Sequence, residues 1–421
     1  MKVCVVGSGG REHALAWVLA RSAEVVVTPG NPGISGSVQT PPEDVAADLF
    51  VIGPEAPLVE GLADRLRARG ALVFGPGADG ARLEGSKAWM KDVLAAADVP
   101  TARHGAFRDV EPAVQFLKSL APPYVVKTDG LAAGKGVLVT ESLSDAADDV
   151  RAKLAGEAFG DAGRTVVVEE GLTGAELSLL AICDGARAVP LAPAQDFKRV
   201  RDGDTGPNTG GMGAYSPVVM ATDDVVGEVM TRAVEPTLHE LRRRGVDYRG
   251  VLYAGLMLTP DGPKVLEYNV RLGDPEAEVV LPRLAADCDL AELLAEAASG
   301  RLRRAPAFRP EAAVTVVLAS EGYPERPRTG DVIDGVDAAA AESDTVVFCA
   351  GVGADAEGRL VTAGGRVLDV TAFGPTVGAA RERAYRAVGR ISWRGMHHRS
   401  DIALAAGKAR PGGGPDGKDG V

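Results

Sequence analysis

The stretch VVKTDGLAAGKGVLV, residues 125–139, is close to a phosphate-binding P-loop but does not complete one. A P-loop reads G-x-x-x-x-G-K-[ST], and the hydroxyl of its last residue holds magnesium. Here only three residues separate the two glycines, and Gly136 stands where the hydroxyl residue should be. The small residues still let a backbone approach a polyphosphate, and Lys127 and Lys135 add positive charge. For this stretch taken alone, a flexible hairpin loop with solvated lysines is the competing interpretation.

A second stretch, VLEYNVRLGDPE (265–276), supplies candidate ligands for the missing magnesium. Glu267, Asn269 and Arg271 are spaced by two, so in a strand they point to one face. Carboxylate and amide oxygens suit Mg²⁺, and a guanidinium would stabilise charge on a transferring phosphoryl group. A solvated strand face is disfavoured because apolar residues surround these three. The metal ligands are therefore expected here, on a strand distant in sequence from the loop.

Two further stretches are suggestive but weaker. The segment VVVEEGLTGAELS (166–178) can offer backbone groups to an adenine edge, and Glu176 could hold a ribose hydroxyl. Acidic residues at a strand end are also commonly just solvated. The segment 196–217 is too long and too rich in Gly, Asn and Asp to be only a connector, which indicates a functional loop. The segment ELSLLAICDG (176–185) is expected to continue the strand TVVVEEGLTG (165–174) as a hairpin-like pair.

Composition excludes several function classes. The 421 residues include 46 basic and 58 acidic side chains, a formal charge of −12, which argues against nucleic acid or an anionic membrane surface as a partner. No apolar run approaches the ~20 residues that span a bilayer, and KVCVV is too short for a signal peptide. The four cysteines lie far apart, so free thiols are expected rather than disulfides or a zinc site. A cytoplasmic protein is predicted.

The first 80 residues alternate short apolar runs with helix-like segments, among them helices over about 11–21 and 58–69. Each apolar run ends in Gly or Pro, as expected where parallel strands stop at a ligand-facing edge, so a doubly wound α/β domain is predicted. The turn GSGGREH is a weak dinucleotide fingerprint, because Glu12 stands where its third glycine would be. From about residue 311 the chain is β-rich and closes with a helix over 377–391.

Taken together and in this order, these stretches resemble the ATP-grasp superfamily, and within it the phosphoribosylamine–glycine ligase family. The resemblance covers almost the whole chain, and DTGPNTGGMGAYSP and GLAAGKGV are long and specific. The matching stretches are GSGGREHALAW (7–17), PGNPG (29–33), IGPEAPLVEGL (52–62), FGPGADGARLEGSKAWMKD (74–92), VVKTDGLAAGKGV (125–137), AFGDAG (158–163), VVEE (167–170), QDFKRVRDGDTGPNTGGMGAYSP (195–217), YAGLML (253–258), LEYNVRLGDPE (266–276), EGYP and RTGDVI (within 321–333) and GGRVLDVTAFG (364–374).

The resemblance implies an α/β and α+β multidomain fold. An N-terminal, substrate-binding doubly wound parallel α/β domain is expected over 1–90. An ATP-grasp domain is expected over 91–300, with a mobile lid at about 110–180. A C-terminal β-rich α+β domain would follow over 301–405. Residues 406–421 are rich in Gly and Pro and are expected to be a disordered tail.

The resemblance also implies a reaction. ATP, glycine and 5-phosphoribosylamine would give glycinamide ribonucleotide, ADP and phosphate in de novo purine (IMP) biosynthesis, through glycyl phosphate and with Mg²⁺ or Mn²⁺. This chemistry needs no protein nucleophile, and the family is commonly monomeric. Two alternatives stay open: another ATP-grasp carboxylate–amine ligase or carboxylase with a different acceptor, and a nucleotide-binding regulator without catalysis. Retention of Lys127, Glu267, Asn269 and Arg271 argues against the regulator.

The resemblance also implies which residues form the active site, one matching position at a time. Arg271 and Lys127 are implied to be catalytic, and Glu267 and Asn269 to bind the metal. The residues implied to bind ATP are Lys87, Lys127, Asp129, Gly130, Leu131, Ala132, Ala133, Gly134, Lys135, Gly136, Val137, Glu169, Glu170, Leu172 and Glu176. Those implied to bind glycine or phosphoribosylamine are Gly9, Gly10, Arg11, Asn31, Glu55, Asp196, Lys198, Asp204, Asn208, Thr209, Gly210, Gly211, Met212, Gly213, Asp274 and Glu276.

The chain departs from the family pattern at two places. Residues 34–48 leave room for one short turn where the family usually has a longer crossover with a helix. After GDPE the family commonly has Thr-Gln, whereas this chain has Ala277 and Glu278, which puts a contact of that glutamine in doubt. Neither departure touches the ATP-binding stretches, so an altered affinity for phosphoribosylamine is expected before a loss of the reaction.

Overall fold

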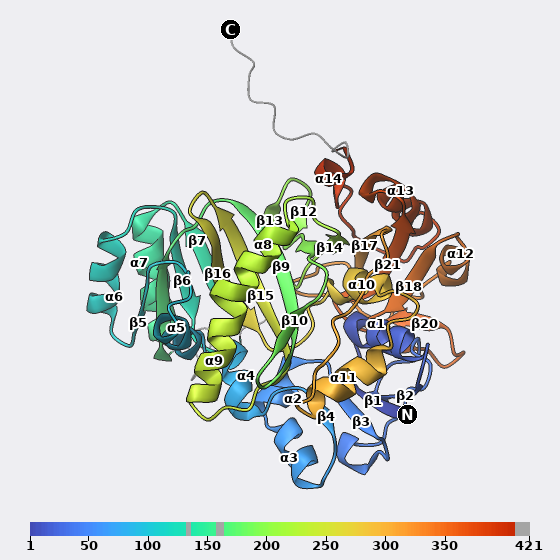
Figure 1. Ribbon diagram of the computed structural model, residues 1–421. Helices are drawn as coiled ribbons and strands as arrows, with labels where there is room; N and C mark the ends of the chain where they lie inside the picture. The colour runs from blue at the N-terminus through green and yellow to red at the C-terminus, as the bar shows by residue number, and fades with distance from the viewer. Residues whose placement is uncertain (132–135, 157–163, 409–421) are drawn as a thin grey trace.

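The computed structural model describes residues 1–131, 136–156 and 164–408. In Figure 1 the N-terminal elements lie at the bottom, a small α/β region lies at the left, and the C-terminal elements lie at the right, with a central sheet between them. Some predictions concern residues outside the described part of the chain: Ala132, Ala133, Gly134 and Lys135 as ATP ligands, the stretch AFGDAG, and residues 409–421 of the predicted tail.

The first four strands form a parallel sheet in the order β2-β1-β3-β4, which confirms the predicted doubly wound α/β domain. The sequences of its strands are short apolar runs, because helices cover the sheet and bury them. The predicted single helix at 58–69 is two helices, since Gly61 takes φ 78° and separates them. Residues 34–48 hold only one 3₁₀ turn, Pro42–Asp44. The bounds are β1 Lys2–Gly7, α1 Gly10–Leu19, β2 Glu24–Pro29, β3 Leu49–Ile52, α2 Glu55–Val59, α3 Leu62–Ala68, β4 Val73–Phe74 and α4 Ala78–Gly85.

A four-stranded antiparallel sheet in the order β5-β8-β6-β7, with helices α6 and α7, forms the region that we call the lid. It has an apolar core of its own, in which Val126, Val150 and Val168 are fully buried. The expected hairpin-like pair of 165–174 with 176–185 is wrong, because β8 belongs to this sheet and β9 to the next. The bounds are β5 His104–Phe107, α6 Val110–Lys118, β6 Tyr124–Thr128, β7 Val137–Thr140, α7 Leu143–Leu154 and β8 Val166–Glu170.

The central sheet is antiparallel, in the order β10-β9-β15-β16. Its long strands are almost continuously buried, because helices α5, α8 and α9 pack beside them. The helix predicted over 224–244 is α8, one π-helical turn at Met230–Val234, and α9. The bounds are α5 Lys87–Ala96, β9 Ala175–Asp184, β10 Ala188–Pro190, α8 Asp223–Val229, α9 Glu235–Arg243, β15 Arg249–Thr259 and β16 Gly262–Asn269.

The C-terminal sheet has the order β11-β14-β17-β21-β18, and it takes two strands from the segment that was predicted to be a loop, 196–217. Helix α14 makes residues 406–408 helical, whereas the disordered tail was predicted to begin at 406. The bounds are β11 Gln195–Asp196, β12 Arg199–Arg201, β13 Thr205–Asn208, β14 Gly213–Ser216, α10 Ala277–Val280, α11 Leu290–Ala298, β17 Ala312–Ala319, α12 Val336–Ala340, β18 Thr345–Cys349, β19 Val352–Ala354, β20 Leu360–Thr362, β21 Arg366–Gly374, α13 Val377–Val388 and α14 Leu404–Lys408.

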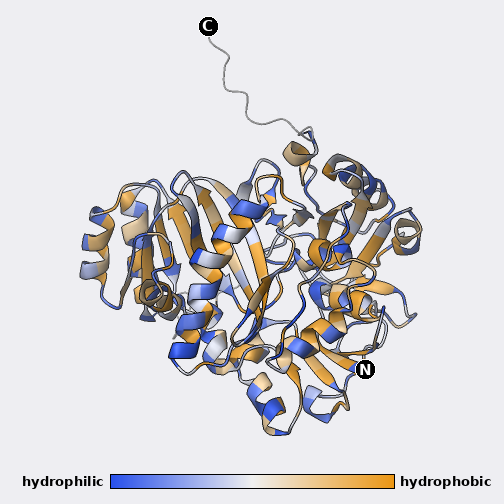
Figure 2. Ribbon diagram, viewed as in Figure 1, coloured by the Kyte–Doolittle hydropathy of each residue, from blue (hydrophilic) through white to orange (hydrophobic). Residues whose placement is uncertain are grey.

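Apolar residues concentrate in the sheets, while the outward helices carry hydrophilic residues, as Figure 2 shows for α9. This is the pattern expected of sheets buried between helices. The four cysteines are free thiols, as predicted. Of the helices in the described ranges, none is long and apolar enough to cross a membrane.

Candidate active site

Two cavities join into one cleft between the lid, the central sheet and the two terminal regions. The larger, of about 1160 Å³, lies between the lid sheet and the central sheet. The smaller, of about 600 Å³, lies between the central sheet, the N-terminal region and the C-terminal region. The residues that line both cavities are Val137, Asp196, Lys198, Asn208, Thr209 and Glu267.

The larger cavity has the walls expected of a nucleotide base site. Apolar side chains from both sheets face it, among them Val139 of the lid and Met257 and Leu266 of the central sheet. The segment from Glu169 to Leu172, which leaves β8, forms part of its edge. A planar base fits between apolar walls, and the backbone of an extended segment can pair with its polar edge. The segment predicted to bind adenine therefore lines this cavity, and its contact with adenine stays a prediction.

Glu169 is held between two lysines at the base of this cavity. Its carboxylate lies 3.0 Å from Nζ of Lys127 and 2.9 Å from Nζ of Lys91, and all three side chains are buried. Burial alone would raise the pKa of Glu169, but the two lysines outweigh it and lower that pKa. Burial lowers the pKa of Lys91 to about 8, against the attraction of Glu169. The carboxylate of Glu169 therefore orients Lys127, and it is the backbone near it that remains available to a base.

Lys87 and the described ends of the glycine-rich loop lie at the mouth of the smaller cavity. Lys87 Nζ donates to the carbonyl of Gly130 at 2.9 Å, and burial lowers its pKa. Asp129 does not point a free carboxylate at the cavity, since it accepts hydrogen bonds from Ser86 Oγ and from the amide of Ala88 at the start of α5. Asp129 thus ties the loop to the helix that carries Lys87.

Glu267 and Asn269 lie side by side on β16 and line the smaller cavity, as the alternation of the strand predicts. Burial would raise the pKa of Glu267, but Lys127, Lys198 and Lys87 lower it, so the carboxylate is ionised at neutral pH. The hydrogen bonds of the described residues include none to this carboxylate. An ionised oxygen donor with an amide oxygen beside it, both facing a cavity, fits a divalent hard cation.

Arg271 follows Asn269 on the same wall and is fixed by acidic partners. Its Nη2 donates to Glu84 Oε1 at 2.8 Å and to Asn269 Oδ1 at 3.2 Å, and its Nε donates to Glu55 Oε2 at 3.3 Å. Burial lowers the pKa of a guanidinium, yet Glu84 and Glu55 keep the pKa of Arg271 above its usual value. Arg271 is therefore a rigid positive charge on the wall of the smaller cavity.

A second cluster of charged side chains consists of Lys198 and Asp196, which line both cavities, and Glu176, which lines the larger one. Lys198 forms an ion pair with Glu176 and lies 3.6 Å from Asp196. Burial raises the pKa of Asp196 to about 7, with Lys198 opposing this and Glu276 and Glu176 adding to it. Glu176, predicted to hold a ribose hydroxyl, lines the larger cavity with its carboxylate already paired to Lys198.

Seven of the residues predicted to bind glycine or phosphoribosylamine line the smaller cavity, in addition to Asp196 and Lys198. They come from four separate segments of the chain, which only the fold brings together. The seven are Arg11, Glu55, Asn208, Thr209, Gly210, Asp274 and Glu276. Asp204 lines the larger cavity instead and pairs with Arg399 at 2.7 Å.

Other residues predicted for substrate binding do not line either cavity. Asn31 is buried, and its amide donates to the carbonyls of Ser8, Cys349 and Ala350, so it joins the N-terminal and C-terminal regions. Met212 is fully buried in the core. The remaining four are Gly9, Gly10, Gly211 and Gly213.

Among the residues at the site that were not predicted from the sequence, four are charged or polar groups that contact predicted residues: Glu84, Lys91, Tyr323 and Arg366. Arg366 Nη1 lies 3.1 Å from Asp274 Oδ1 and donates to the carbonyl of Gly210 at 2.7 Å. Tyr323 OH accepts from the amide of Gly210 at 3.1 Å. All four lie in or beside the stretches that carry the family resemblance, and this resemblance could have marked them as site residues. The spacing of residues along the chain does not predict which partner each of them contacts.

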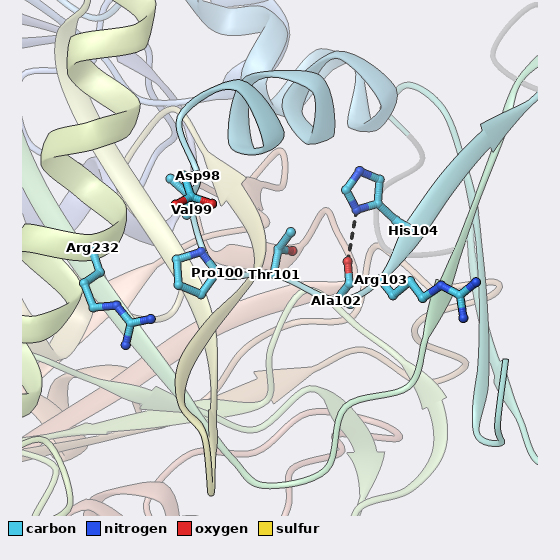
Figure 3. A pocket seen from close by; sticks show the side chains of 8 residues that line it. All are labelled: Asp98, Val99, Pro100, Thr101, Ala102, Arg103, His104 and Arg232. Atoms are coloured by element: carbon cyan, nitrogen blue, oxygen red, sulfur yellow. Dashed lines mark hydrogen bonds between the residues drawn. The ribbon is translucent and has the colours of Figure 1, made fainter.

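A third, open hollow lies at the junction of α5 and β5, and Figure 3 labels the residues that line it. Arg232 and Arg103 lie at opposite ends of it, and His104 Nδ1 is bonded to the carbonyl of Ala102 at 3.0 Å. None of its lining residues lines the cleft. Its groups do not converge on a common point, so it has no part in the site.

The comparisons with known proteins agree with the geometry. Models of the phosphoribosylglycinamide synthetase family match residues 1–84 (N domain), 85–277 (ATP-grasp, or A, domain) and 313–405 (C domain). The phosphoribosylamine–glycine ligase of Xanthomonas campestris pv. campestris is 47% identical over 426 residues, 96% of this chain and 98% of that protein. The ligase of the same name from Streptomyces coelicolor is 49% identical over 428 residues, 97% of this chain and 100% of that protein.

Solved structures give the same result for the fold. The crystal structure of phosphoribosylamine–glycine ligase from Thermotoga maritima has a TM-score of 0.85 and 36% identity, covering 96% of this chain and 100% of that one. The biotin carboxylase domain of Hydrogenobacter thermophilus 2-oxoglutarate carboxylase, in complex with MgADP, has a TM-score of 0.70 at 17% identity, covering 94% and 91%. This second likeness concerns the fold alone.

Proposed function

This chain belongs to the phosphoribosylglycinamide synthetase family, and we propose that it joins glycine to 5-phosphoribosylamine at the expense of ATP. The products are glycinamide ribonucleotide, ADP and phosphate, and the reaction belongs to purine biosynthesis. The observation that carries the proposal is the wall shared by the two cavities. There the ionised Glu267 faces Lys127, Lys87 and Lys198, next to Arg271.

ATP fits the cleft in one direction. Its base and ribose take the larger cavity, between the lid and the central sheet, with the backbone of residues 169–172 at the base edge. Its phosphates then reach the junction of the two cavities, between Lys127, which lines the larger one, and Lys87 and Arg271, which line the smaller one and add positive charge. Phosphoryl transfer depends on such positioning and on electrostatic stabilisation more than on covalent chemistry of the protein.

Glu267 and Asn269 are the residues that would hold Mg²⁺ or Mn²⁺. A divalent ion there supplies positive charge to the phosphate oxygens during transfer. The chain's own contribution is the orientation of these two side chains. Asn269 Oδ1 is held by Arg271, and the lysines keep Glu267 ionised.

The ligation proceeds in two steps. A glycine carboxylate oxygen bonds to the γ-phosphorus while the bond between that phosphorus and its bridging oxygen breaks, which gives glycyl phosphate and ADP. The amine of phosphoribosylamine then bonds to the acyl carbon, phosphate leaves with the carboxylate oxygen, and the amine proton passes to the departing phosphate. Arg271 stabilises the negative charge of the transferred phosphoryl group in both steps.

The smaller cavity takes glycine and phosphoribosylamine. Arg11 and Arg366 line it and carry positive charge that suits the ribose phosphate. Asp274 lies against Arg366, and Glu276 is held by Tyr253 OH and Ser178 Oγ, so these two carboxylates shape the cavity. Their position next to Gly210 places the segment around residues 208–210 against the same substrates.

An assay for ADP release with each substrate omitted in turn tests the proposal. Release is expected only with ATP, glycine and phosphoribosylamine together. A carboxylase of this fold would release ADP with bicarbonate in place of glycine and without phosphoribosylamine, and that result would overturn the assignment of substrates. A regulator without catalysis would bind ATP and release no ADP under any combination.

A further inference from the structure

Three carboxylates meet behind the smaller cavity, outside the proposed metal site. Asp274 follows β16, Glu278 lies on α10, and Asp369 lies in the middle of β21. One oxygen of each lies within 4.8 Å of the others.

Two of these carboxylates are buried without partners. Glu278 and Asp369 are 0% exposed, and within the described ranges neither oxygen of either side chain has a hydrogen-bond partner. Four buried acceptor oxygens without donors are costly, because each has lost its water without a replacement. Such a group needs a cation or a proton between its oxygens.

The space around the two buried carboxylates is closed on the side of α1. A Cβ added to Gly10, the first residue of α1, would lie 1.9 Å from Asp369 Oδ2 and 2.9 Å from Glu278 Oε1. On β21, Asp369 lies level with Val317 of β17 and Phe348 of β18, which are apolar. The start of a helix favours negative charge, yet among the described residues no amide of α1 bonds to either carboxylate.

The charges of the cluster do not balance. Arg366 lies 3.1 Å from Asp274 and is the cation that acts on the group. Three ionised carboxylates and one guanidinium leave a net charge of −2 in a closed space. Burial, together with the neighbouring carboxylates, raises the pKa of Glu278 and of Asp369 well above the usual carboxyl value.

We propose that Asp274, Glu278 and Asp369 bind a hard divalent cation, separate from the metal held by Glu267 and Asn269. A charge of +2 neutralises the cluster, and its donors are all carboxylate oxygens, which suit Ca²⁺, Mn²⁺ or Mg²⁺ rather than softer metals. Because Mg²⁺ usually retains several waters, a closed site of this kind favours Ca²⁺ or Mn²⁺. The bound cation joins β21 to α10 and fixes Asp274 on the wall of the smaller cavity.

The test counts Mn²⁺ bound to the nucleotide-free protein by the loss of the EPR signal of free Mn²⁺. The variant Glu278→Gln/Asp369→Asn keeps the shape of the cluster and removes two charges. The matched control, Glu267→Gln, removes a charge from the other site. We expect the control to keep one Mn²⁺ that the double variant loses. A double variant that binds as many ions as the unchanged protein would overturn the proposal, as would an unchanged protein that binds none.

A second measurement covers the case in which the double variant folds poorly. Thermal unfolding of each protein is followed with EDTA and with Ca²⁺, and the single variant Glu278→Gln is included. Ca²⁺ is expected to raise the Tm of the unchanged protein and of the Glu267→Gln control, and to raise that of Glu278→Gln much less. An equal rise in all of them would contradict the site. If Ca²⁺ has no effect and acid alone raises the Tm of the unchanged protein, the cluster holds protons and the proposal is wrong.

Discussion

Replacing Arg271 by methionine removes the guanidinium that neutralises Glu84 and Glu55, and the structure indicates what this costs. Arg271 Nη2 lies 2.8 Å from Glu84 Oε1, and the side chain of Glu84 is only 10% exposed. Removing one partner of a buried ion pair typically costs about 3–5 kcal/mol, since the other charge is left uncompensated. The pair with Glu55 is longer, at 3.3 Å, and Glu55 is 34% exposed, so it adds little.

We therefore expect Arg271→Met to lower the free energy of unfolding by about 3 kcal/mol, near the low end of that range because methionine fills part of the space. Loss of a charge that stabilises the transferred phosphoryl group should also reduce kcat by about 10²–10³. Urea unfolding, followed by tryptophan fluorescence, measures the first effect. ADP release with all three substrates measures the second.

The double variant Arg271→Met/Glu84→Gln separates the two effects. Glutamine removes the buried charge and still accepts from the amide of Val270, which lies 2.9 Å from Glu84 Oε2. Most of the lost stability should return, with a coupling energy of about 2 kcal/mol, while kcat stays low. These two roles of Arg271 are contradicted if Arg271→Met unfolds with unchanged free energy, or if the double variant recovers activity along with stability.

Three further predictions concern the same cleft. Glu267→Gln should weaken the binding of Mn²⁺ in the presence of ATP and reduce kcat by at least about 10-fold, measured by EPR and ADP release; unchanged turnover would contradict the metal assignment. Lys91→Met removes one of the two lysines that pair with Glu169 and leaves Lys127. The KM for ATP should therefore rise several-fold, with a smaller change in the KM for glycine. Equal changes in the two KM values would contradict a role of Lys91 in the ATP site. The pKa of Asp196 is raised to about 7 mainly by burial, so the folded state keeps a proton that the unfolded state loses from about pH 4 upward. The contribution of Asp196 to stability therefore falls as pH rises from about 4 to 7. Asp196→Asn should flatten the dependence of Tm on pH in that range. An unchanged slope would show that the raised pKa of Asp196 does not cause this dependence.

The parts of the site that rest on local regularity could be predicted from the sequence. Glu267, Asn269 and Arg271 share a wall because strand residues alternate, and this holds whatever β16 packs against. The parallel N-terminal sheet was predicted from another local signal, the Gly or Pro that ends each apolar run. The bounds of the domains at 90 and 300 stay a prediction.

The remainder depends on contacts between residues distant in sequence. Glu84 meets Arg271 across 187 positions, and Lys91 meets Glu169 across 78, so no spacing rule finds either pair. Asn31 was predicted to contact substrate because its stretch resembles the family, whereas its amide joins two regions of the chain. The pairing of β14 with β17 likewise could not be predicted, because four residues of a polar segment carry no strand signal until a partner strand is present.

Transfer of ¹⁸O from the carboxylate of glycine to phosphate tests whether the ligation passes through glycyl phosphate. With glycine labelled in both carboxylate oxygens, the glycyl phosphate route places one ¹⁸O in each phosphate released during ligation. We predict phosphate with one label per glycinamide ribonucleotide formed, measured by mass spectrometry. Unlabelled phosphate, formed together with glycinamide ribonucleotide, would contradict the acyl phosphate and with it the roles given to Lys127 and Arg271.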